Sequence, residues 1–218
     1  RDGRIDLYIG RSSLADFYRK ALPQLREAAE IIEIRPELIQ KYIPVEPEFI
    51  CFLDVDQEAV LCEPFVYYGE KCHSPFDSDR WKHRTAEAEH YRDTEAETAL
   101  MDFLSICMPE KDAAAKIFLT PRGDEALFEF LDTGLSRLMA MSEVRATDRF
   151  MRLKVRRRIP FHAGISLSEG LLSVELTSND LSPDEILAAV SGYRLSQRYI
   201  RLKNGDFLRL EENEELRR

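Results

Sequence analysis

Residues 181–210 read LSPDEILAAVSGYRLSQRYIRLKNGDFLRL, and this stretch predicts a helix followed by a β-hairpin. Ser182 can act as the N-cap, Pro183 fits the first helical position, and Glu185 can close a capping box. The apolar residues that follow at helical spacing are Ile186, Leu187 and Val190. Gly192 comes next and is expected to stop the helix.

The hairpin is expected around Asn204 and Gly205, and the apolar pattern selects its register. A two-residue turn would scatter apolar residues over both faces. A three-residue loop, Lys203–Gly205 with Gly205 left-handed, separates them, because a one-residue slip exchanges the faces. The apolar face then holds Ile200, Leu202, Leu208 and Leu210. The opposite face is basic and aromatic and holds Tyr199, Arg201, Phe207 and Arg209.

Composition narrows the class of protein. The 218 residues carry a net charge of −9 and are 44% hydrophobic and 33% charged, which is typical of a globular protein. The negative charge argues against a general nucleic-acid coat protein but leaves room for a local basic patch. No apolar run approaches the roughly 18 residues of a membrane span, and no signal peptide is recognisable. The four cysteines, Cys51, Cys62, Cys72 and Cys107, have no CxxC spacing and resemble reduced cytosolic thiols. We therefore expect a cytoplasmic protein with no membrane partner.

Both ends of the chain suggest a piece of a longer protein. It begins at Arg1 without a methionine and stops in an acidic stretch, residues 211–218, that has the pattern of a helix start.

Further segments are assigned from their periodicity. Two β-rich runs, Phe49–Val55 and Ala59–Tyr68, predict a hairpin. Helices are predicted over most of Thr85–Met108 and around Leu127–Leu138. The later β-patterned segments are Glu143–Thr147, Met151–Arg157, and a hairpin of Gly164–Leu167 with Leu172–Leu176, one face of which should be buried.

Because strands and helices are grouped and do not strictly alternate, the chain is predicted to have an α+β fold. We expect largely antiparallel sheets with packed helices, ending in the helix-plus-hairpin module. Residues 1–218 are interpreted as a single region. If there are two domains, the boundary is expected between Asp112 and Thr120.

Familiar catalytic motifs are missing. The sequence has no G-x-x-x-x-G-K-[ST], no G-x-G-x-x-G, no G-x-S-x-G and no H-E-x-x-H. The residues that could suggest zinc are Cys62, Cys72, His73, His83 and His90. Their spacing does not match the close pairs of tetrahedral zinc sites. No catalytic residue, metal ligand or cofactor is therefore assigned.

An acidic run stands at the start of the long predicted helix. Its members are Glu87, Glu89, Asp93, Glu95 and Glu97. Such a run could support acid–base chemistry. A solvated helix face is the preferred interpretation, because charge runs usually have that role.

The strongest local signal is basic. Its core consists of Arg152, Lys154, Arg156, Arg157 and Arg158, preceded by Arg145 and Arg149. In a strand, alternate members would share one face and could follow a phosphate backbone. Pairing with acidic residues of the same fold is the alternative.

The basic and aromatic face of the terminal hairpin also allows two interpretations. Tyr199, Arg201, Phe207 and Arg209 could stack on nucleic-acid bases. Arginine stems that cover aromatic rings within the same protein explain the pattern as well, and we prefer that interpretation.

Several short motifs, in order, resemble a known family. They are YIPVEPEF at 42–49, CFLDV at 51–55, FVYYG at 65–69, FEFLDTGL at 128–135, YR at 193–194 and YIRLKNGDFL at 199–208. From about Leu7 to Leu210 the chain resembles the helicase-associated region of bacterial SWI/SNF-type ATPases. Each motif is short and structural, so the resemblance depends on their shared order.

The resemblance implies a position beside a motor. Such regions lie amino-terminal to a two-lobed ATPase that hydrolyses ATP with Mg²⁺ and moves along duplex DNA, often with a zinc-binding SWIM module further upstream. The family offers no defined active site in this region. We therefore expect a non-catalytic accessory domain that positions or regulates the ATPase lobes of the same polypeptide. The alternative is a module that binds duplex or single-stranded nucleic acid directly.

Overall fold

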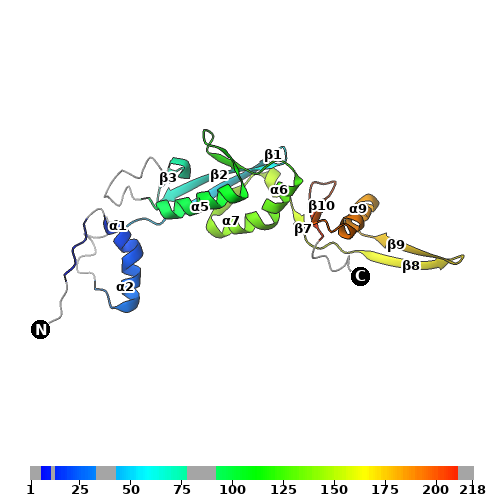
Figure 1. Cartoon of the computed structure of the whole chain (residues 1–218), viewed down its shortest axis with the longest axis horizontal. Helices are drawn as coiled ribbons and strands as arrows, with labels where there is room; N and C mark the ends of the chain where they lie inside the picture. Colours follow the sequence, from blue (N-terminus) through cyan, green and yellow to red (C-terminus); the bar gives the residue numbers. More distant parts are fainter. Residues whose placement is uncertain (1–5, 11–12, 33–42, 78–91, 211–218) are drawn as a thin grey trace.

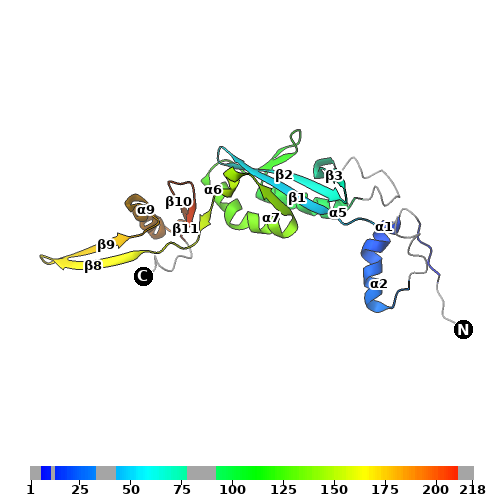
Figure 2. The same cartoon turned by 180° about the vertical axis from the view of Figure 1, so that it is seen from behind.

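The computed structural model describes residues 6–10, 13–32, 43–77 and 92–210. Four parts follow one another along the long axis of the molecule (Figures 1 and 2). An N-terminal helical segment lies at one end and is followed by a sheet covered by helices, which we call the body. A smaller helix-and-strand unit comes next, the terminal module. A two-stranded hairpin, the arm, projects from it at the far end.

The N-terminal segment consists of α1 (Leu14–Asp16), the π-helical turn η2 (Phe17–Ala21) and α2 (Leu22–Ala28). Among the residues of this segment whose burial is described, only Leu22 is buried. The segment therefore adds little to the core of the protein.

The body contains a six-stranded sheet. Its elements are β1 (Glu48–Asp56), β2 (Ala59–Tyr68), β3 (Lys71–His73), β4 (Glu110–Asp112), β5 (Ile117–Leu119) and β6 (Glu143–Ala146). The order is β4-β5-β2-β1-β6, with β3 also paired to β2. The predicted hairpin of β1 and β2 is confirmed, with Gln57 and Glu58 in its turn at positive φ. Residues 112–120 end β4 and form β5 of this same sheet.

All pairings in the body sheet are antiparallel except that of β6, which runs parallel to β1. The chain passes from β5 to this parallel strand through α6 (Asp124–Glu129), the π-helical turn η6 (Phe130–Gly134) and α7 (Leu135–Met141). The longer helix α5 (Thr94–Cys107) comes earlier, between β3 and β4. The α+β fold is thus confirmed.

The helices cover one face of the sheet, and the body core lies between them. Buried side chains from the sheet include Cys51, Leu53 and Cys62. Leu104 of α5 and Phe128 of α6 close the core from the other side. The first long helix begins at Thr94, so residues 92 and 93 are not helical as predicted. The Asp93 side chain caps the helix by accepting a hydrogen bond from Ala96 N at 2.9 Å, which fixes this start. Residues 85–91 lie outside the described part of the chain.

The predicted strand Met151–Arg157 is mostly wrong. A helical turn, α8 (Asp148–Met151), precedes a strand of two residues, β7 (Val155–Arg156). Thr147 caps α8 by accepting a hydrogen bond from Phe150 N at 3.3 Å, and Phe150 is buried in the body core. A capped turn with a buried aromatic residue therefore prevailed over the alternating charge pattern.

The terminal module is built as the sequence predicts. It contains α9 (Pro183–Arg194), β10 (Tyr199–Arg201) and β11 (Phe207–Arg209), with β7 beside β11. Ile200 pairs with Leu208, which leaves Lys203–Gly205 as the three-residue loop, and Gly205 has φ +91°. The predicted register is confirmed.

Glu185 ties the start of α9 to the hairpin loop. One carboxylate oxygen accepts from Ser182 N at 2.8 Å, and the other accepts from Lys203 N at 2.8 Å. These hydrogen bonds, that of Lys203 first, lower the pKa of Glu185 to about 2. The predicted capping box is confirmed and also fixes the position of the loop.

Gly192 does not stop the helix, which continues to Arg194. Gly192 is buried, and a Cβ placed there would lie 2.9 Å from Leu210 Cδ1 and 3.2 Å from Ile200 Cγ2. The glycine is therefore needed for close approach of the helix to the hairpin, and not for a left-handed ending.

A second core fills the terminal module. Its buried members are Ile159, Leu181, Ile186, Ala189, Leu202, Leu208 and Leu210. Phe207, the neighbour of Leu208 on β11, is buried instead in the body core. Because successive side chains of a strand point to opposite faces, β11 contributes to both cores at once.

The arm is formed by β8 (His162–Ser168) and β9 (Leu171–Thr177), paired antiparallel, with Glu169 and Gly170 at positive φ in its turn. The predicted hairpin is confirmed, but the predicted burial of one face is wrong. Leu172, Val174 and Leu176 are all exposed. Alternating apolar residues identify a face that is stabilised when another surface packs on it. Within the described residues no other element packs on this face.

Candidate interaction surfaces

The predicted basic segment lies between the body and the terminal module and does not form one continuous stripe. Arg152 follows α8, and Lys154 precedes β7. Arg156 Nε donates to Asp206 Oδ2 at 2.9 Å, and Asp206 is itself buried. Arg156 therefore has a structural role, because its ion pair with Asp206 joins β7 to the hairpin loop.

The remaining cations of this segment face solvent. Arg152, Lys154, Arg157 and Arg158 are all exposed. Arg157 lies 4.0 Å from Asp132, at the limit of an ion pair. Arg145 and Arg149 are engaged elsewhere, with Glu143 at 2.7 Å and with the carbonyl oxygen of Val55 at 3.1 Å. Four exposed positive charges thus gather within seven residues.

The basic and aromatic face of the terminal hairpin packs against α6. The rings of Phe128 and Tyr199 stack with centroids 4.3 Å apart and planes 22° apart. Phe207, which is 0% exposed, completes the aromatic cluster at 5.7 Å from Phe128 and 5.4 Å from Tyr199. Burial and a hydrogen bond to Glu125 raise the pKa of Tyr199 to about 12.

The arginines of the same face pair with acidic residues of the body. Arg201 contacts Asp124 and donates to Glu58 at 2.7 Å. Arg209 lies 3.4 Å from Asp132, which is buried. Arg201 also lies over the Phe207 ring, at 5.7 Å from its centroid. The aromatic rings are thus covered within the protein, as the preferred interpretation expected.

The sequence did not identify the partners of this face. Phe128, Asp124 and Asp132 lie on one helical segment, and their spacing alone suggested only a core helix. A signal was present in the alternation of acidic and aromatic residues from Asp124 to Asp132, which complements the basic and aromatic pattern of the hairpin. Recognising it requires knowledge that the two segments meet.

The acidic run is not a solvated face throughout. Glu95 is exposed as expected, and Glu87 and Glu89 lie outside the described residues. Asp93 and Glu97, however, are buried, and Glu97 is 0% exposed. These two carboxylates can be buried because both accept hydrogen bonds within the protein.

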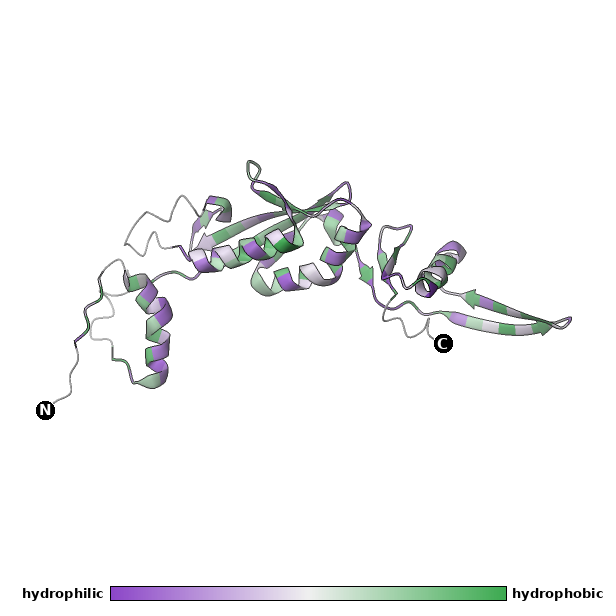
Figure 3. Ribbon diagram, viewed as in Figure 1, coloured by the Kyte–Doolittle hydropathy of each residue, from purple (hydrophilic) through white to green (hydrophobic). Residues whose placement is uncertain are grey.

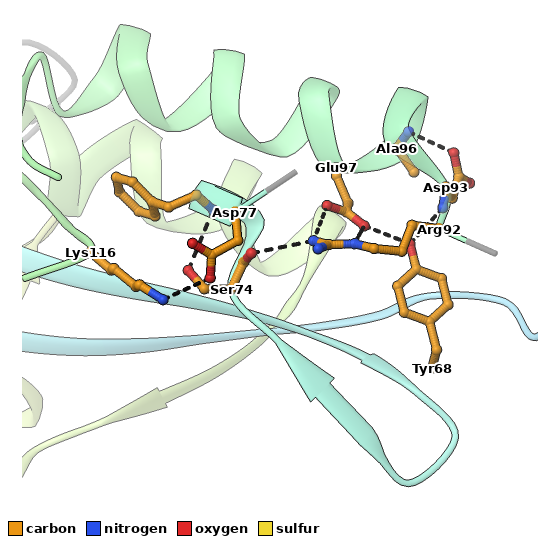
Figure 4. A network of polar contacts seen from close by, with 9 residues as sticks. Tyr68, Ser74, Asp77, Arg92, Asp93, Ala96, Glu97 and Lys116 are labelled. Atoms are coloured by element: carbon orange, nitrogen blue, oxygen red, sulfur yellow. Dashed lines mark hydrogen bonds and ion pairs between the residues drawn. The ribbon is translucent and has the colours of Figure 1, made fainter. Parts of the chain in front are cut away.

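A polar network surrounds Glu97 (Figure 4). Its Oε1 accepts from Tyr68 Oη at 2.7 Å and from Arg92 Nε at 2.8 Å, and its Oε2 accepts from Arg92 Nη2 at 2.5 Å. Tyr68 Oη in turn accepts from Asp93 N at 2.6 Å. Arg92 also donates to the carbonyl oxygen of Ser74 at 3.2 Å. The network joins β2, the loop after β3 and the start of α5.

This geometry favours a structural role over acid–base chemistry. Both oxygens of Glu97 are occupied by donors, and a bidentate guanidinium holds the carboxylate in place. Burial, followed by the hydrogen bond to Glu97, raises the pKa of Tyr68. Arg19 of η2 contacts Asp93, so the N-terminal segment is attached at the same place.

The residues considered for zinc do not gather into a site. Cys62 is buried in the sheet, Cys72 is exposed, and His73 is half-buried. His83 and His90 lie outside the described residues. Over residues 6–10, 13–32, 43–77 and 92–210 no group of three or more His, Cys, Asp or Glu side chains could hold a metal ion.

The buried ion pair generates a prediction about stability. Replacing Glu97 with glutamine should lower the free energy of unfolding by about 3 to 5 kcal/mol, because the buried Arg92 guanidinium loses the carboxylate that it contacts with two nitrogens. Urea unfolding followed by circular dichroism measures this. Glu95→Gln is the matched control, since Glu95 forms a largely exposed pair with Lys20 and should cost less than about 1 kcal/mol. Equal costs for the two variants would contradict the structural role.

Comparison with known proteins gives one family. The model of a family described as bacterial SNF2 helicase associated matches residues 4–218. No curated protein and no solved structure matches the chain. None of the helices in the described ranges is long and apolar enough to cross a membrane. Because the family model spans nearly all residues, the chain belongs to the bacterial SNF2 helicase-associated family.

Proposed function

We propose that this chain is a non-catalytic accessory region of a bacterial, cytoplasmic SNF2-type DNA translocase or helicase. In this role it positions or regulates the ATPase motor of the same polypeptide. ATP and Mg²⁺ would bind in the ATPase lobes, and no residue of this chain is assigned to them. Membership of the helicase-associated family supports the link to such a motor.

The observation that carries the proposal is the shared strand β11. An accessory region that positions another domain must hold its own parts at a fixed spacing. Phe207 is buried in the body core, and Leu208, the next residue, is buried in the core of the terminal module. The terminal module, from which the arm projects, is therefore held firmly to the body. A rigid connection of this kind can keep two contact surfaces at a fixed distance.

The proposal predicts a physical and functional contact with the motor. The purified chain, added to the SNF2 helicase region of the same polypeptide, should bind it and change its rate of DNA-stimulated ATP hydrolysis. Fluorescence anisotropy of the labelled chain and a phosphate-release assay measure the two effects. The chain alone with ATP and duplex DNA should show no turnover. Absence of binding together with unchanged hydrolysis rates would contradict the proposal.

A second function, direct contact with DNA, is favoured by one observation. Arg152, Lys154, Arg157 and Arg158 are exposed on a chain whose net charge is −9. A local cluster of this kind can neutralise phosphates although the whole protein is acidic. Tyr199, Arg201 and Arg209, which the sequence also suggested for nucleic-acid contact, make the body contacts described above, so they add little to this second function.

This second function predicts salt-sensitive binding of duplex DNA. The variant Arg152→Ala/Lys154→Ala/Arg158→Ala should bind more weakly, with the slope of log K against log salt reduced by about 0.9 for each phosphate that the variant no longer neutralises. Arg156 is left intact because its pair with Asp206 supports the fold. The control variant Lys71→Ala/Arg122→Ala/Arg137→Ala makes the same change in net charge on the body. Equal binding by both variants would remove the basic segment from consideration.

A further inference from the structure

The two faces of the arm differ sharply in polarity. The register of β8 and β9 places Ile165 opposite Val174 and Leu167 opposite Leu172, so these residues share one face. The other face carries Ser166 opposite Ser173 and Gly164 opposite Glu175, with Leu171 beside the turn as its one large apolar residue. Apolar residues therefore run along the whole length of one face, and hydrophobic stretches follow both strands in Figure 3.

The described residues leave this apolar face open. Ile165 is 71% exposed, Leu167 is 74% exposed and Leu172 is 66% exposed. None of the three belongs to either core cluster. A lone two-stranded hairpin is only marginally stable in water, and a continuous exposed apolar patch marks an interaction site. The face is thus built to be covered.

The size of the face argues against a second copy of this chain as its cover. A stable interface between separate proteins takes about 20 to 30 residues on each side. The apolar face offers six, which are Ala163, Ile165, Leu167, Leu172, Val174 and Leu176. Two copies would also each bring a net charge of −9 into contact. Within one polypeptide a small contact is enough, because tethering gives effective concentrations of about millimolar.

The surroundings of the arm indicate the chemistry of the partner. The segment that leads into β8 carries the exposed Arg157 and Arg158. A partner that covers the apolar face down to the base of the arm, where the chain carries these charges, should present an apolar patch with acidic groups at the matching end. Complementary charge at the border sets the orientation more than it adds affinity.

We propose that the apolar face of the arm docks on an apolar, acid-bordered patch of the SNF2 helicase part of the same polypeptide. This inference rests on the proposed function and names its contact surface. The arm reaches away from the body at the end opposite the N-terminal segment (Figures 1 and 2), which leaves its apolar face accessible to such a partner.

The test is a titration of the labelled chain with the helicase region of the same polypeptide, carried up to about millimolar, the effective concentration that the tether supplies in the intact protein. The variant Ile165→Ser/Leu167→Ser/Leu172→Ser should lose about tenfold or more in affinity, because central apolar anchors carry most of the binding energy. The control Ser166→Ala/Ser173→Ala changes the polar face of the same two strands and should bind like the wild type. Thermal unfolding of both variants should match the wild type, because the altered residues lie outside both cores.

The outcomes separate this inference from the proposed function. If the wild-type chain does not bind the helicase region, the proposed function fails and the docking face fails with it. If the wild type binds and the triple serine variant binds equally well, only the docking face is overturned. Sedimentation of the chain alone provides the third outcome, since a dimer abolished by the triple serine variant would make a second copy the occupant and overturn the choice of partner.

Discussion

The fold depends on one strand that serves two hydrophobic cores. Phe207 lies against Phe128 in the body core, and Leu208 lies with Leu202 in the core of the terminal module. A strand can do this because its side chains alternate between faces. Moving β11 away from the body would take Phe207 out of the body core and expose its ring to solvent. The module therefore cannot separate from the body without disrupting its core.

Ion pairs surround this junction, and its basic residues serve to pair with acidic residues of the same protein. Arg198 pairs with Glu129 at 2.9 Å, Arg201 pairs with Asp124, and Arg156 pairs with Asp206. Surface pairs contribute little stability each, but their charges specify how the hairpin meets α6. The exposed cations just outside the junction and the open apolar face of the arm are then the groups left for partners.

What the sequence predicted well was local. The register of the terminal hairpin followed from Gly205 and the alternation of Ile200, Leu202 and Leu208, all within one short stretch. The β1–β2 hairpin was equally accessible, because each strand pairs with its neighbour in the chain. The family resemblance depended on these same short motifs in order.

What the sequence did not predict depends on contacts between distant segments. Glu97 looked like part of a solvated face because Tyr68 of β2, which helps to bury it, lies far from it in the chain, and the nearby Arg92 alone does not indicate burial. Gly192 looked like a helix stop because Leu210, which packs against it, belongs to the hairpin. In the arm, the alternating sequence correctly predicted an apolar face. It could not show that no described part of this chain packs on that face.

The shared strand is tested most directly by native-state hydrogen exchange. The amides of β10 and β11 should open with the same free energy as those of β1 and β2, because both regions should unfold as one cooperative unit. In Phe207→Ala both sets should lose protection together. If β10, β11 and α9 exchanged at a clearly lower free energy while β1 and β2 kept their protection, the module would be independent of the body and the role of the shared strand would be contradicted.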